Sequence, residues 1–385
     1  MKQGPHILFI LEFYYPHVGG VETLFHTLIK ALTRAGYRCT VLTQRFDQSL
    51  PARETRDGVV IRRIRVPNRY LFSVFGFFAA LPLVRRADLI HTTSYNAGLP
   101  AFFSGFLARK ATIITFHEAW GKLWFQLPFI GSVSAWGHYL FEQVLLRLPF
   151  RQFIAVSGAT AQRLREEGVG SQRITMIPNG LEYAEWTQGA RPGPTQPPLP
   201  PGREEAFTYT YFGRIGISKG LDLLLPAAAA FARHYPRSCL QLIIPRTPSP
   251  ITRWVEDFIE AHQLHQQISI RHSLPFSELK HSLQRSRWVV VPSYSEGFCF
   301  AAAEAAALGV PLVHSNRAAL AEVVSGYHAP MHTFSIEGLT DALLRAARNE
   351  WMFKPYQPYP MANSLQAYCR LYEEVLPAFA KNSTA

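Results

Sequence analysis

The sequence predicts an α/β protein with two doubly wound parallel-sheet domains, and three observations support this. Short apolar runs that suit buried parallel strands alternate along the chain with stretches of helical spacing. A proline-rich spacer between residues 189 and 202 interrupts this alternation once. The length of 385 residues is also more than one compact core normally holds. We therefore expect a first domain over residues 1–187, a linker over 188–204, a second domain over 205–350 and a helical C-terminal segment over 351–385.

The composition favours a globular protein with anionic partners. Hydrophobic residues make up 48% of the chain, which is enough for each half to bury a core. A net charge of +12 and an isoelectric point near 9.7 favour nucleotides, phosphates or acidic lipid surfaces as partners. The basic residues are scattered along the chain, and this argues against a nucleic-acid-binding protein.

Cysteine usage and the longest uncharged runs bear on location. The four cysteines lie far apart, without metal-ligand or Cys-x-x-Cys spacing, which indicates a reducing compartment. The N-terminus leads straight into an apolar strand, so we expect no secretory signal. The uncharged runs Tyr70–Val84 and Leu123–Phe141 are too short or too interrupted to span a bilayer. We expect a cytoplasmic protein that contacts the cytoplasmic face of a membrane peripherally.

The first half opens as a strand–helix–strand unit. Ile7–Leu11 is a continuous apolar strand, Val21–Arg34 carries apolar residues on one helical face, and Cys39–Thr43 is the next strand. Such a unit is typical of a parallel sheet. The further elements expected in this half are strands at Val59–Val66, Asp88–His91, Thr112–Phe116, Phe153–Ser157 and Ile174–Pro178, a helix at Ala159–Glu167, and a loop plus helix within Phe125–Phe150.

Two features of this half are placed to meet a ligand. Gly19 and Gly20 follow the first strand, where they either allow close approach of a ligand to the backbone or simply form a tight turn. The G-x-G-x-x-G fingerprint is missing there, which argues against an NAD-dependent oxidoreductase. His117 directly follows the strand Thr112–Phe116, and ligands gather at the carboxyl ends of parallel strands. A purely local hydrogen-bonding role is the alternative for this histidine.

The second half repeats the alternation of strands and helices. We expect strands at Tyr209–Phe212, Leu240–Ile244, Ile268–Ile270, Ser286–Val291 and Pro311–Val313, helices at Leu221–His234, Ile251–Gln263, Phe276–Leu283, Gly338–Asn349 and Asn363–Phe379, and a short helix near Glu322. Arg214 and Lys219 flank a glycine-containing loop after the first of these strands. The spacing differs from a P-loop, because Gly220 stands where Ser or Thr is required. The two cations suit a diphosphate, and two solvated surface cations are the alternative.

A stretch that is rich in alanine and contains two glutamates follows the strand Ser286–Val291. Glu296 lies in the loop and Glu304 in the helix that the alanines predict. Unpaired burial of a carboxylate is costly, so hydroxyl or amide partners are needed on such a closely packed helix. The amides of residues 298–300 would face outward from the helix start, where an anion or a sugar hydroxyl can bind. The stretch predicts a polar-ligand site, and two solvated surface carboxylates are the alternative.

Taken together, the motifs of the two halves resemble those of a known family. In chain order they are Pro16-His17-Val18-Gly19-Gly20-Val21-Glu22, Thr115-Phe116-His117, Ala155-Val156-Ser157, Ile177-Pro178-Asn179-Gly180, Phe212-Gly213-Arg214 with Lys219-Gly220, and the Glu-x7-Glu element from Glu296 to Glu304 after Pro292-Ser293. In this order and spacing, nearly the whole chain resembles a retaining glycosyltransferase of family 4. The resemblance implies the GT-B fold, in which an acceptor-binding and a nucleotide-sugar-binding Rossmann-like domain face a central cleft. It also implies that the last helix, around Tyr368 to Leu376, crosses back to the N-terminal domain.

The resemblance further implies a role for each candidate residue. The implied donor-binding residues are Gly19, Gly20, Arg214, Lys219, Glu296, Gly297, Phe298, Cys299 and Glu304, and the implied catalytic residues are His117, Arg214, Lys219 and Glu296. The two cations bind the donor's diphosphate and offset the charge of the departing nucleotide. Glu304 holds the ribose hydroxyls, while Glu296 and the neighbouring amides hold the transferred sugar. His117 lies near the reacting centre, and the glycine pair lies beside the phosphates.

The implied chemistry needs no metal and no other cofactor. The donor is a UDP- or GDP-sugar, and the acceptor is a glycan, a lipid-linked molecule or a small molecule. Retention of configuration implies a front-face displacement, in which the leaving phosphate helps to deprotonate the acceptor. The aromatic and basic segments Tyr70–Arg86 and Leu123–Arg151 point to a lipid-linked or membrane-surface acceptor. The alternative function is a catalytically inactive nucleotide-binding protein of the same fold that acts as a partner or scaffold.

Two loops depart from the family's pattern. Pro245-Arg246-Thr247-Pro248 stands where a Gly-x-Gly turn is common, and Asn316-Arg317-Ala318-Ala319-Leu320 precedes Glu322 where glycines are usual. The first departure concerns recognition of the base, and the second concerns how the sugar and phosphate are held. Neither removes a charged residue from the candidate set.

Overall fold

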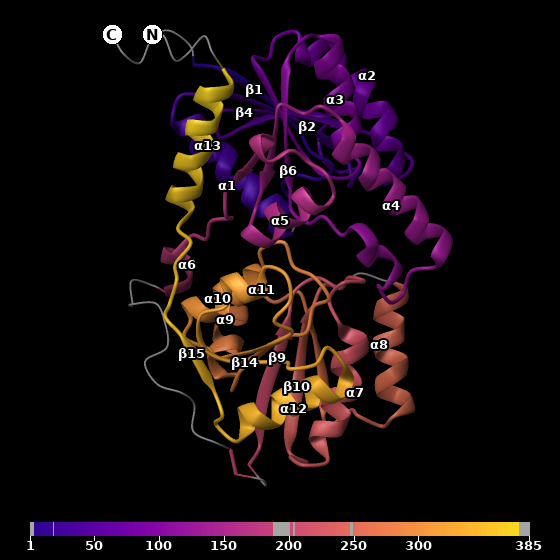
Figure 1. Ribbon diagram of the computed structural model, residues 1–385, viewed down its shortest axis with the longest axis vertical. Helices are drawn as coiled ribbons and strands as arrows, with labels where there is room; N and C mark the ends of the chain where they lie inside the picture. Colours follow the sequence, from indigo (N-terminus) through magenta and orange to yellow (C-terminus); the bar gives the residue numbers. More distant parts are fainter. Residues whose placement is uncertain (1–3, 18, 188–200, 203–204, 247–248, 377–385) are drawn as a thin grey trace. The chain divides into compact units, whose positions relative to one another are not determined.

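The chain folds into two compact units, each built around one mainly parallel sheet (Figure 1). The computed structural model describes residues 4–17, 19–187, 201–202, 205–246 and 249–376. The described residues of the first unit fall within Met1–Lys122, Trp136–Gly180 and Tyr359–Ala385, and those of the second within Leu123–Ala135 and Leu181–Pro358. Most of the linker that the sequence places at 188–204 lies outside the described residues.

The first unit holds an eight-stranded sheet in the order β3-β4-β2-β1-β5-β6-β7-β8. Its strands are β1 His6–Ile10, β2 Arg38–Gln44, β3 Arg53–Arg56, β4 Val59–Ile64, β5 Leu89–Thr93, β6 Ala111–Phe116, β7 Gln152–Ala155 and β8 Ile174–Met176. Neighbouring strands pair in parallel, except that the edge strand β3 pairs antiparallel with β4. The central strands β1, β5 and β6 are almost wholly buried, which is why they read as continuous apolar runs in the sequence.

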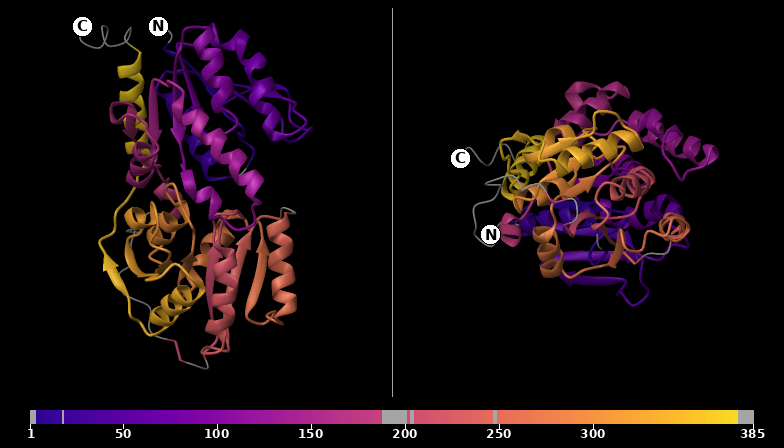
Figure 2. Two further views of the ribbon diagram at one scale, coloured as in Figure 1. Left: turned by 45° about the vertical axis from the view of Figure 1, so that its right-hand side comes forward. Right: turned by 90° about the horizontal axis from the view of Figure 1, so that it is seen from below.

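Helices cover both faces of this sheet (Figures 1 and 2). They are α1 Gly20–Arg34, α2 Phe72–Val84, α3 Gly98–Leu107, α4 Ser132–Arg147, α5 Gly158–Glu166 and α13 Met361–Val375, with short 3-10 turns η1 Arg69–Leu71, η2 Gly121–Phe125 and η3 Ser171–Arg173. The end of η2 and the start of α4 belong to the second unit. On one face, α2 and α3 pack over Ile90, and α4 and α5 pack in the cluster that contains Ile114. His91 is the next residue after Ile90 and points to the other face. There its ring contacts Phe25 of α1 and Tyr372 of α13.

The second unit holds a seven-stranded sheet in the order β11-β10-β9-β12-β13-β14-β15. Its strands are β9 Phe207–Phe212, β10 Ser238–Ile244, β11 Ile268–His272, β12 Val289–Val291, β13 Leu312–His314, β14 Gly326–Pro330 and β15 Met352–Lys354, and only β15 is antiparallel to its neighbour. Its helices are α6 Tyr183–Thr187, α7 Leu221–Ala232, α8 Pro250–Ala261, α9 Phe276–Arg285, α10 Phe300–Ala307, α11 Leu320–Val323 and α12 Ile336–Ala347. The core of the unit centres on the buried ring of Trp288, which packs against Tyr209 and Phe231.

The predicted fold class is confirmed, with antiparallel strands at one edge of each sheet as a correction. Sequence reasoning missed the helices α2, α3 and α6 and the strands β3, β14 and β15. Helix α3 contains no charged residue, so no polar face distinguishes it from a buried strand. Strand β3 is polar, and β14 begins with Gly326 and ends with Pro330, residues that normally punctuate strands. The predicted helix Asn363–Phe379 corresponds to α13, and its last predicted residues lie outside the described part of the chain.

Candidate active site

Three loops of the second unit meet at the carboxyl ends of adjacent strands. The loops follow β9, β12 and β13, which are neighbours in the sheet. They comprise residues 213–220, 292–299 and 315–319. The carboxyl edge of an open parallel sheet is the usual place for a ligand, because loops and helix N-termini converge there. The two loops that the sequence singles out by their charges are therefore brought to one place by the strand order.

Backbone contacts lock these loops together. The amide of Tyr294 donates to the carbonyl of Ser218 over 2.8 Å. Gly220 has a φ of +70°, and a Cβ added there would lie 2.1 Å from the carbonyl oxygen of Pro292. Only glycine satisfies both conditions. The hydroxyl of Ser315 donates to the carbonyl of Ser293 over 2.7 Å, which ties the third loop to the second.

Lys219 and Glu296 form an ion pair at the centre of this assembly. The Lys219 Nζ lies 2.8 Å from Oε1 and 2.9 Å from Oε2 of Glu296. The hydroxyl of Ser293 donates a further hydrogen bond of 2.7 Å to Oε1. Glu296 is only 9% exposed, so its charge is compensated by close partners and not by bulk water. The arrangement places one cation and one hydrogen-bonding carboxylate within reach of the same small ligand.

Arg214 lies at the start of the first loop and is exposed to solvent. Its carbonyl accepts a 3.0 Å hydrogen bond from the hydroxyl of Tyr211, which fixes the backbone at this point. The preceding Gly213 has a φ of +132°, a conformation that favours glycine. In the described part of the chain no acidic side chain pairs with the Arg214 guanidinium, so its donors remain available for an anion.

The turn into helix α10 is held in an unusual backbone conformation. Cys299 has φ and ψ of 73° and 77°, in the left-handed region that residues with a Cβ seldom adopt. Its carbonyl accepts the first hydrogen bonds of the helix, from Ala302 and Ala303. Burial raises the pKa of the Cys299 thiol well above its usual value, so the thiol stays neutral. Such strained turns are concentrated at ligand-binding sites.

The rings of Phe298 and Phe300 pack edge to face across this turn, with centroids 5.3 Å apart. Gly297 immediately precedes Phe298, in the same loop as Glu296. The predicted donor-binding residues 296–299 therefore form one continuous turn at the N-terminus of α10, where backbone amides and the helix dipole favour an electronegative ligand.

Glu304 lies within α10, among alanines. It keeps partial contact with solvent, yet the apolar surroundings raise the pKa of its carboxyl to about 8. Desolvation is the cause, because the charged form loses water and gains nothing in exchange. Within the described residues its carboxyl has no hydrogen-bond or ion-pair partner. A ligand that offers hydroxyl groups would supply the missing partners.

In the first unit, His117 directly follows β6, as the sequence predicts. Its ring meets that of Phe25 edge to face at 6.0 Å. The loop after His117 is held by Glu142 of α4, whose carboxylate accepts from the amides of Trp120 and Gly121 at 3.0 and 2.6 Å. Glu142 is only 2% exposed, and sequence reasoning missed it, because its spacing from His117 gives no local signal.

Gly19 and Gly20 mark the beginning of α1. Gly20 is the first helical residue, and the Gly19 carbonyl accepts from the amide of Thr23 over 2.9 Å. The φ of Gly19 is −177°, an extended conformation that any residue adopts. The backbone therefore does not require glycine at position 19. Close approach of a ligand to this backbone, which the sequence suggested, stays a prediction.

A second buried acid of the first unit was also missed. Glu12 lies two residues beyond β1 and is 7% exposed. It forms an ion pair with Arg69 at 2.7 Å and accepts from the side-chain amide of Asn96 at 3.0 Å. Burial raises the pKa of Glu12 in spite of the nearby Arg69 guanidinium. Its position after a central strand is a signal that sequence reasoning could have used.

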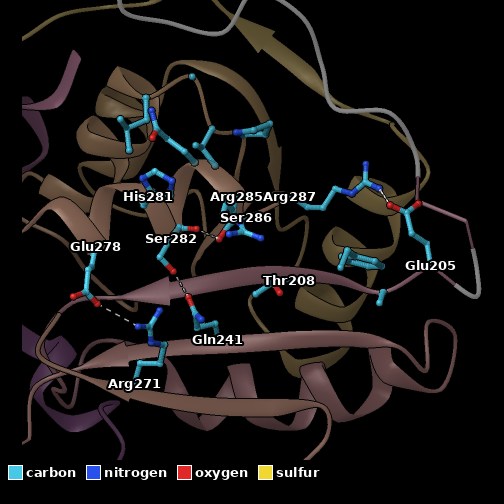
Figure 3. Close-up of a pocket in the computed structure, with 17 residues that line it drawn as sticks. Glu205, Thr208, Gln241, Arg271, Glu278, His281, Ser282, Arg285, Ser286 and Arg287 are labelled. Atoms are coloured by element: carbon cyan, nitrogen blue, oxygen red, sulfur yellow. Dashed lines mark hydrogen bonds and ion pairs between the residues drawn. The ribbon is translucent and has the colours of Figure 1, made fainter. Parts of the chain in front are cut away.

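No group of His, Cys, Asp and Glu side chains suited to hold a metal ion occurs among the described residues. A cavity of about 1130 Å³ lies in the second unit, at the opposite edge of the sheet (Figure 3). Its lining includes residues at the amino ends of β9 and β12, with Arg271 directed toward Glu278 and Ser282 toward Gln241. It contains none of the candidate residues, so we do not regard it as the active site.

Comparison with known proteins identifies the family. The model of "Glycosyltransferase Family 4" matches residues 18–185, and that of "Glycosyl transferases group 1" matches residues 200–357. The chain belongs to glycosyltransferase family 4. Solved structures share its GT-B fold: sucrose-phosphate synthase from Thermosynechococcus elongatus superimposes with a TM-score of 0.68, at 20% identity and over 98% of each chain.

Two further proteins are similar to this chain. The HepE protein of Anabaena, solved in complex with UDP-glucose, has a TM-score of 0.68 at 14% identity, covering 96% of this chain and 99% of its own. One component of the human phosphatidylinositol N-acetylglucosaminyltransferase is 23% identical over 354 residues, which are 89% of this chain and 68% of the human protein. The resemblance to a family 4 glycosyltransferase that the sequence motifs carry is thus confirmed.

Proposed function

We propose that this family 4 glycosyltransferase transfers a sugar from a nucleotide-sugar donor to an acceptor hydroxyl with retention of configuration. The observation that carries the proposal is the Lys219–Glu296 pair, which holds a cation and a carboxylate together at the carboxyl edge of the second sheet. A nucleotide-sugar presents a diphosphate next to a ring of hydroxyls. Such a donor can therefore engage both partners of the pair at once.

The other residues of the second unit complete the proposed donor site. Arg214 and Lys219 bind the diphosphate, since a guanidinium chelates oxygens and an ammonium acts as a compact charge. Glu304 accepts from the ribose hydroxyls, which fits a carboxyl that has no partner among the described residues. Glu296 and the turn at residues 297–299 hold the hydroxyls of the transferred sugar.

The first unit contributes the remaining proposed contacts. His117 lies near the transferred sugar and the reacting centre, on a loop that Glu142 holds in place. Gly19 and Gly20 let the backbone at the start of α1 come close to the phosphates. Acceptors bind to this unit.

The proposed chemistry is a front-face displacement. The bond between the anomeric carbon and the leaving phosphate oxygen breaks, and a bond to the acceptor oxygen forms on the same face. The acceptor proton passes to the leaving phosphate oxygen. Negative charge grows on the diphosphate as the bond breaks, and Arg214 and Lys219 offset that charge without a metal ion.

The relatives suggest substrate classes for this chain. HepE was solved with UDP-glucose, and the human relative is named for transfer of N-acetylglucosamine involving phosphatidylinositol. We propose a UDP- or GDP-sugar as donor and a lipid-linked or other glycan acceptor for this chain. The reaction is expected in the cytoplasm or at the cytoplasmic face of a membrane.

Nucleotide binding tests the donor site directly. UDP, GDP and ADP are compared by isothermal titration calorimetry and by the shift in melting temperature, since a ligand selective for the native state raises it. One nucleoside diphosphate should bind, and R214Q should weaken that binding at least about tenfold, because one charge-assisted contact is lost. R271Q, which removes another exposed arginine of the same unit, is the matched control and should bind as the wild type does. If no nucleoside diphosphate binds, the proposed function fails.

Turnover separates the enzyme from the inactive scaffold. With the corresponding nucleotide-sugar, the wild type should slowly hydrolyse the donor and release the nucleoside diphosphate, and E296Q should not. Nuclear magnetic resonance of the released sugar reports the anomer, and the α anomer from an α-linked donor supports retention. Tight nucleotide binding without hydrolysis or transfer to any offered acceptor would favour the scaffold alternative.

A further inference from the structure

Helices α2, α3 and α4 present an apolar outer face on the first unit. They lie side by side over one face of the sheet, with α3 between the other two (Figures 1 and 2). Each helix turns large apolar side chains to solvent at helical spacing: Val74, Phe75 and Phe78 on α2, Phe103, Phe106 and Leu107 on α3, and Trp136, Leu140 and Val144 on α4. Phe78 and Phe106 are 62% and 71% exposed. We call these nine residues the aromatic face.

A face of this kind needs an explanation. Single exposed apolar residues are ordinary, but contiguous apolar patches mark surfaces that something covers. The three helices are already packed on the sheet through their inner sides, which contain residues such as Phe72, Phe102 and Leu145. Phe103 and Phe106 contact the ring of Phe102, yet they and the other outer residues stay exposed, and water contacts them at a cost in free energy.

Basic residues predominate around the aromatic face. Helices α2 and α3 contain no charged residue, and in α4 the one acid, Glu142, is buried against backbone amides. Between residues 69 and 151 the chain has eight basic and three acidic residues. Seven of the basic residues lie within four residues of an end of these helices: Arg69, which pairs with Glu12, and Arg85, Arg86, Arg109, Lys110, Arg147 and Arg151. In the described part of the chain, no acidic side chain pairs with Arg85, Arg86 or Arg109.

We propose that the aromatic face docks the protein on an anionic lipid bilayer. Aromatic and aliphatic side chains enter the boundary between headgroups and acyl chains, while the flanking arginines and lysines contact lipid phosphates. Apolar residues at the centre with cations at the rim are complementary to a negatively charged membrane surface. The described residues contain no helix long and apolar enough to cross a membrane, so the contact is interfacial.

The inference does not depend on the chemistry of the donor site. Docking on a bilayer would bring the acceptor-binding unit to acceptors that are lipids or are anchored by lipids. This would deepen the proposed function, but vesicle binding can be measured without any donor. A failure of one proposal is therefore distinguishable from a failure of the other.

Vesicle sedimentation with the full chain tests the proposal. The wild type should bind vesicles of phosphatidylcholine with 30% phosphatidylglycerol, because apolar insertion and attraction to anionic lipids act together. High salt should release the protein, because it screens the charges. The variant F78S/F106S/W136S should bind at least about tenfold more weakly, because it loses apolar insertion on all three helices. The charge variant R85Q/R86Q/R109Q should lose the preference for anionic over neutral vesicles. All six positions are exposed, so the variants should stay folded, as melting temperature verifies.

A matched control is an exposed aromatic residue elsewhere. Phe353 on β15 is 58% exposed, and F353S should bind vesicles as the wild type does. Equal binding by the wild type and F78S/F106S/W136S overturns the proposal, as does a wild type that ignores anionic vesicles. A stable dimer in light scattering that the triple variant abolishes, without vesicle binding, would show that a second copy of the chain covers the face instead.

Discussion

The ammonium of Lys219 lies 2.8 and 2.9 Å from the two carboxylate oxygens of Glu296, although the residues are 77 positions apart in the chain. Each group neutralises the other in a place with little water. A bound nucleotide-sugar would change both sets of contacts, since its diphosphate attracts the ammonium and its hydroxyls donate to the carboxylate. We infer that the pair keeps the site organised before the donor binds, and that donor binding replaces the contacts within the pair by contacts to the donor.

The ion pair predicts a characteristic pattern of stability. K219M leaves the Glu296 carboxylate with the Ser293 hydroxyl as its remaining side-chain partner among the described residues. We expect the free energy of unfolding to fall by about 1–3 kcal/mol, because a nearly buried charge loses its counter-ion. K219M/E296Q should recover part of this loss, since no uncompensated charge remains. Urea denaturation measures both variants, and equal losses in the single and double variant would contradict the coupling.

Gly220 predicts a strong substitution effect. G220A places a Cβ in a left-handed conformation and 2.1 Å from the Pro292 carbonyl oxygen, so the loops must separate. We expect a loss of stability of about 2 kcal/mol or more, together with weaker nucleotide binding. Gly216 in the same loop is the control, because a Cβ there would meet only the Lys219 side chain at 3.5 Å. Thermal melts of G220A and G216A that coincide would show that the close approach does not matter.

Glu304 predicts a dependence of stability on pH. Its pKa is about 8 in the folded chain against an ordinary value of 4.5. As pH rises between these values, the unfolded chain releases the proton and the folded chain keeps it, so the free energy of unfolding falls. E304Q lacks this fall and should gain stability relative to the wild type from pH 5 to pH 8, by up to about 4 kcal/mol. A difference in melting temperature that is constant across this range would refute the shifted pKa.

The same carboxyl predicts a pH dependence of donor binding. Ribose hydroxyls donate hydrogen bonds, so they favour the ionised form of Glu304 and lower its pKa. The affinity for the nucleoside diphosphate should therefore rise between pH 7 and pH 9 in the wild type and stay constant in E304Q. Calorimetry with the nucleoside diphosphate that binds measures this difference, and a nucleoside lacking both ribose hydroxyls should abolish it.

Glu142 predicts a positioning effect on the His117 loop. E142Q keeps the shape of the side chain but removes the charge from two hydrogen bonds to the amides of Trp120 and Gly121. We expect turnover to fall about tenfold or more while nucleotide affinity is unchanged, because the altered loop lies in the first unit. E166Q, which removes the charge of an exposed pair with Arg163, is the control. If E142Q changed donor affinity and turnover alike, a general loss of structure would be the better explanation.

Much of the fold could be predicted from the sequence, because strands and helices are set by local patterns. Buried strands such as β1 and β6 are runs of apolar residues, and amphipathic helices such as α1 show one apolar face. Elements without that contrast were missed. Helix α3 is apolar throughout, and the edge strands are short or polar, so their positions depend on the sheet that they join.

For the candidate site, sequence by itself determined which residue types follow which strands. Arg214, Lys219, Glu296 and Glu304 stand in strand–loop–helix units, and His117 follows a buried strand, so each could be named from its neighbours in the chain. Only the tertiary structure decided which groups meet. The sheet order makes β9 and β12 neighbours, and this alone brings Lys219 to Glu296 and Gly220 to Pro292. The partners of Glu142, and the bond between His91 and Tyr372 across 281 positions, likewise arise from packing, because contact in a folded chain depends on sheet register and crossover geometry and not on sequence spacing.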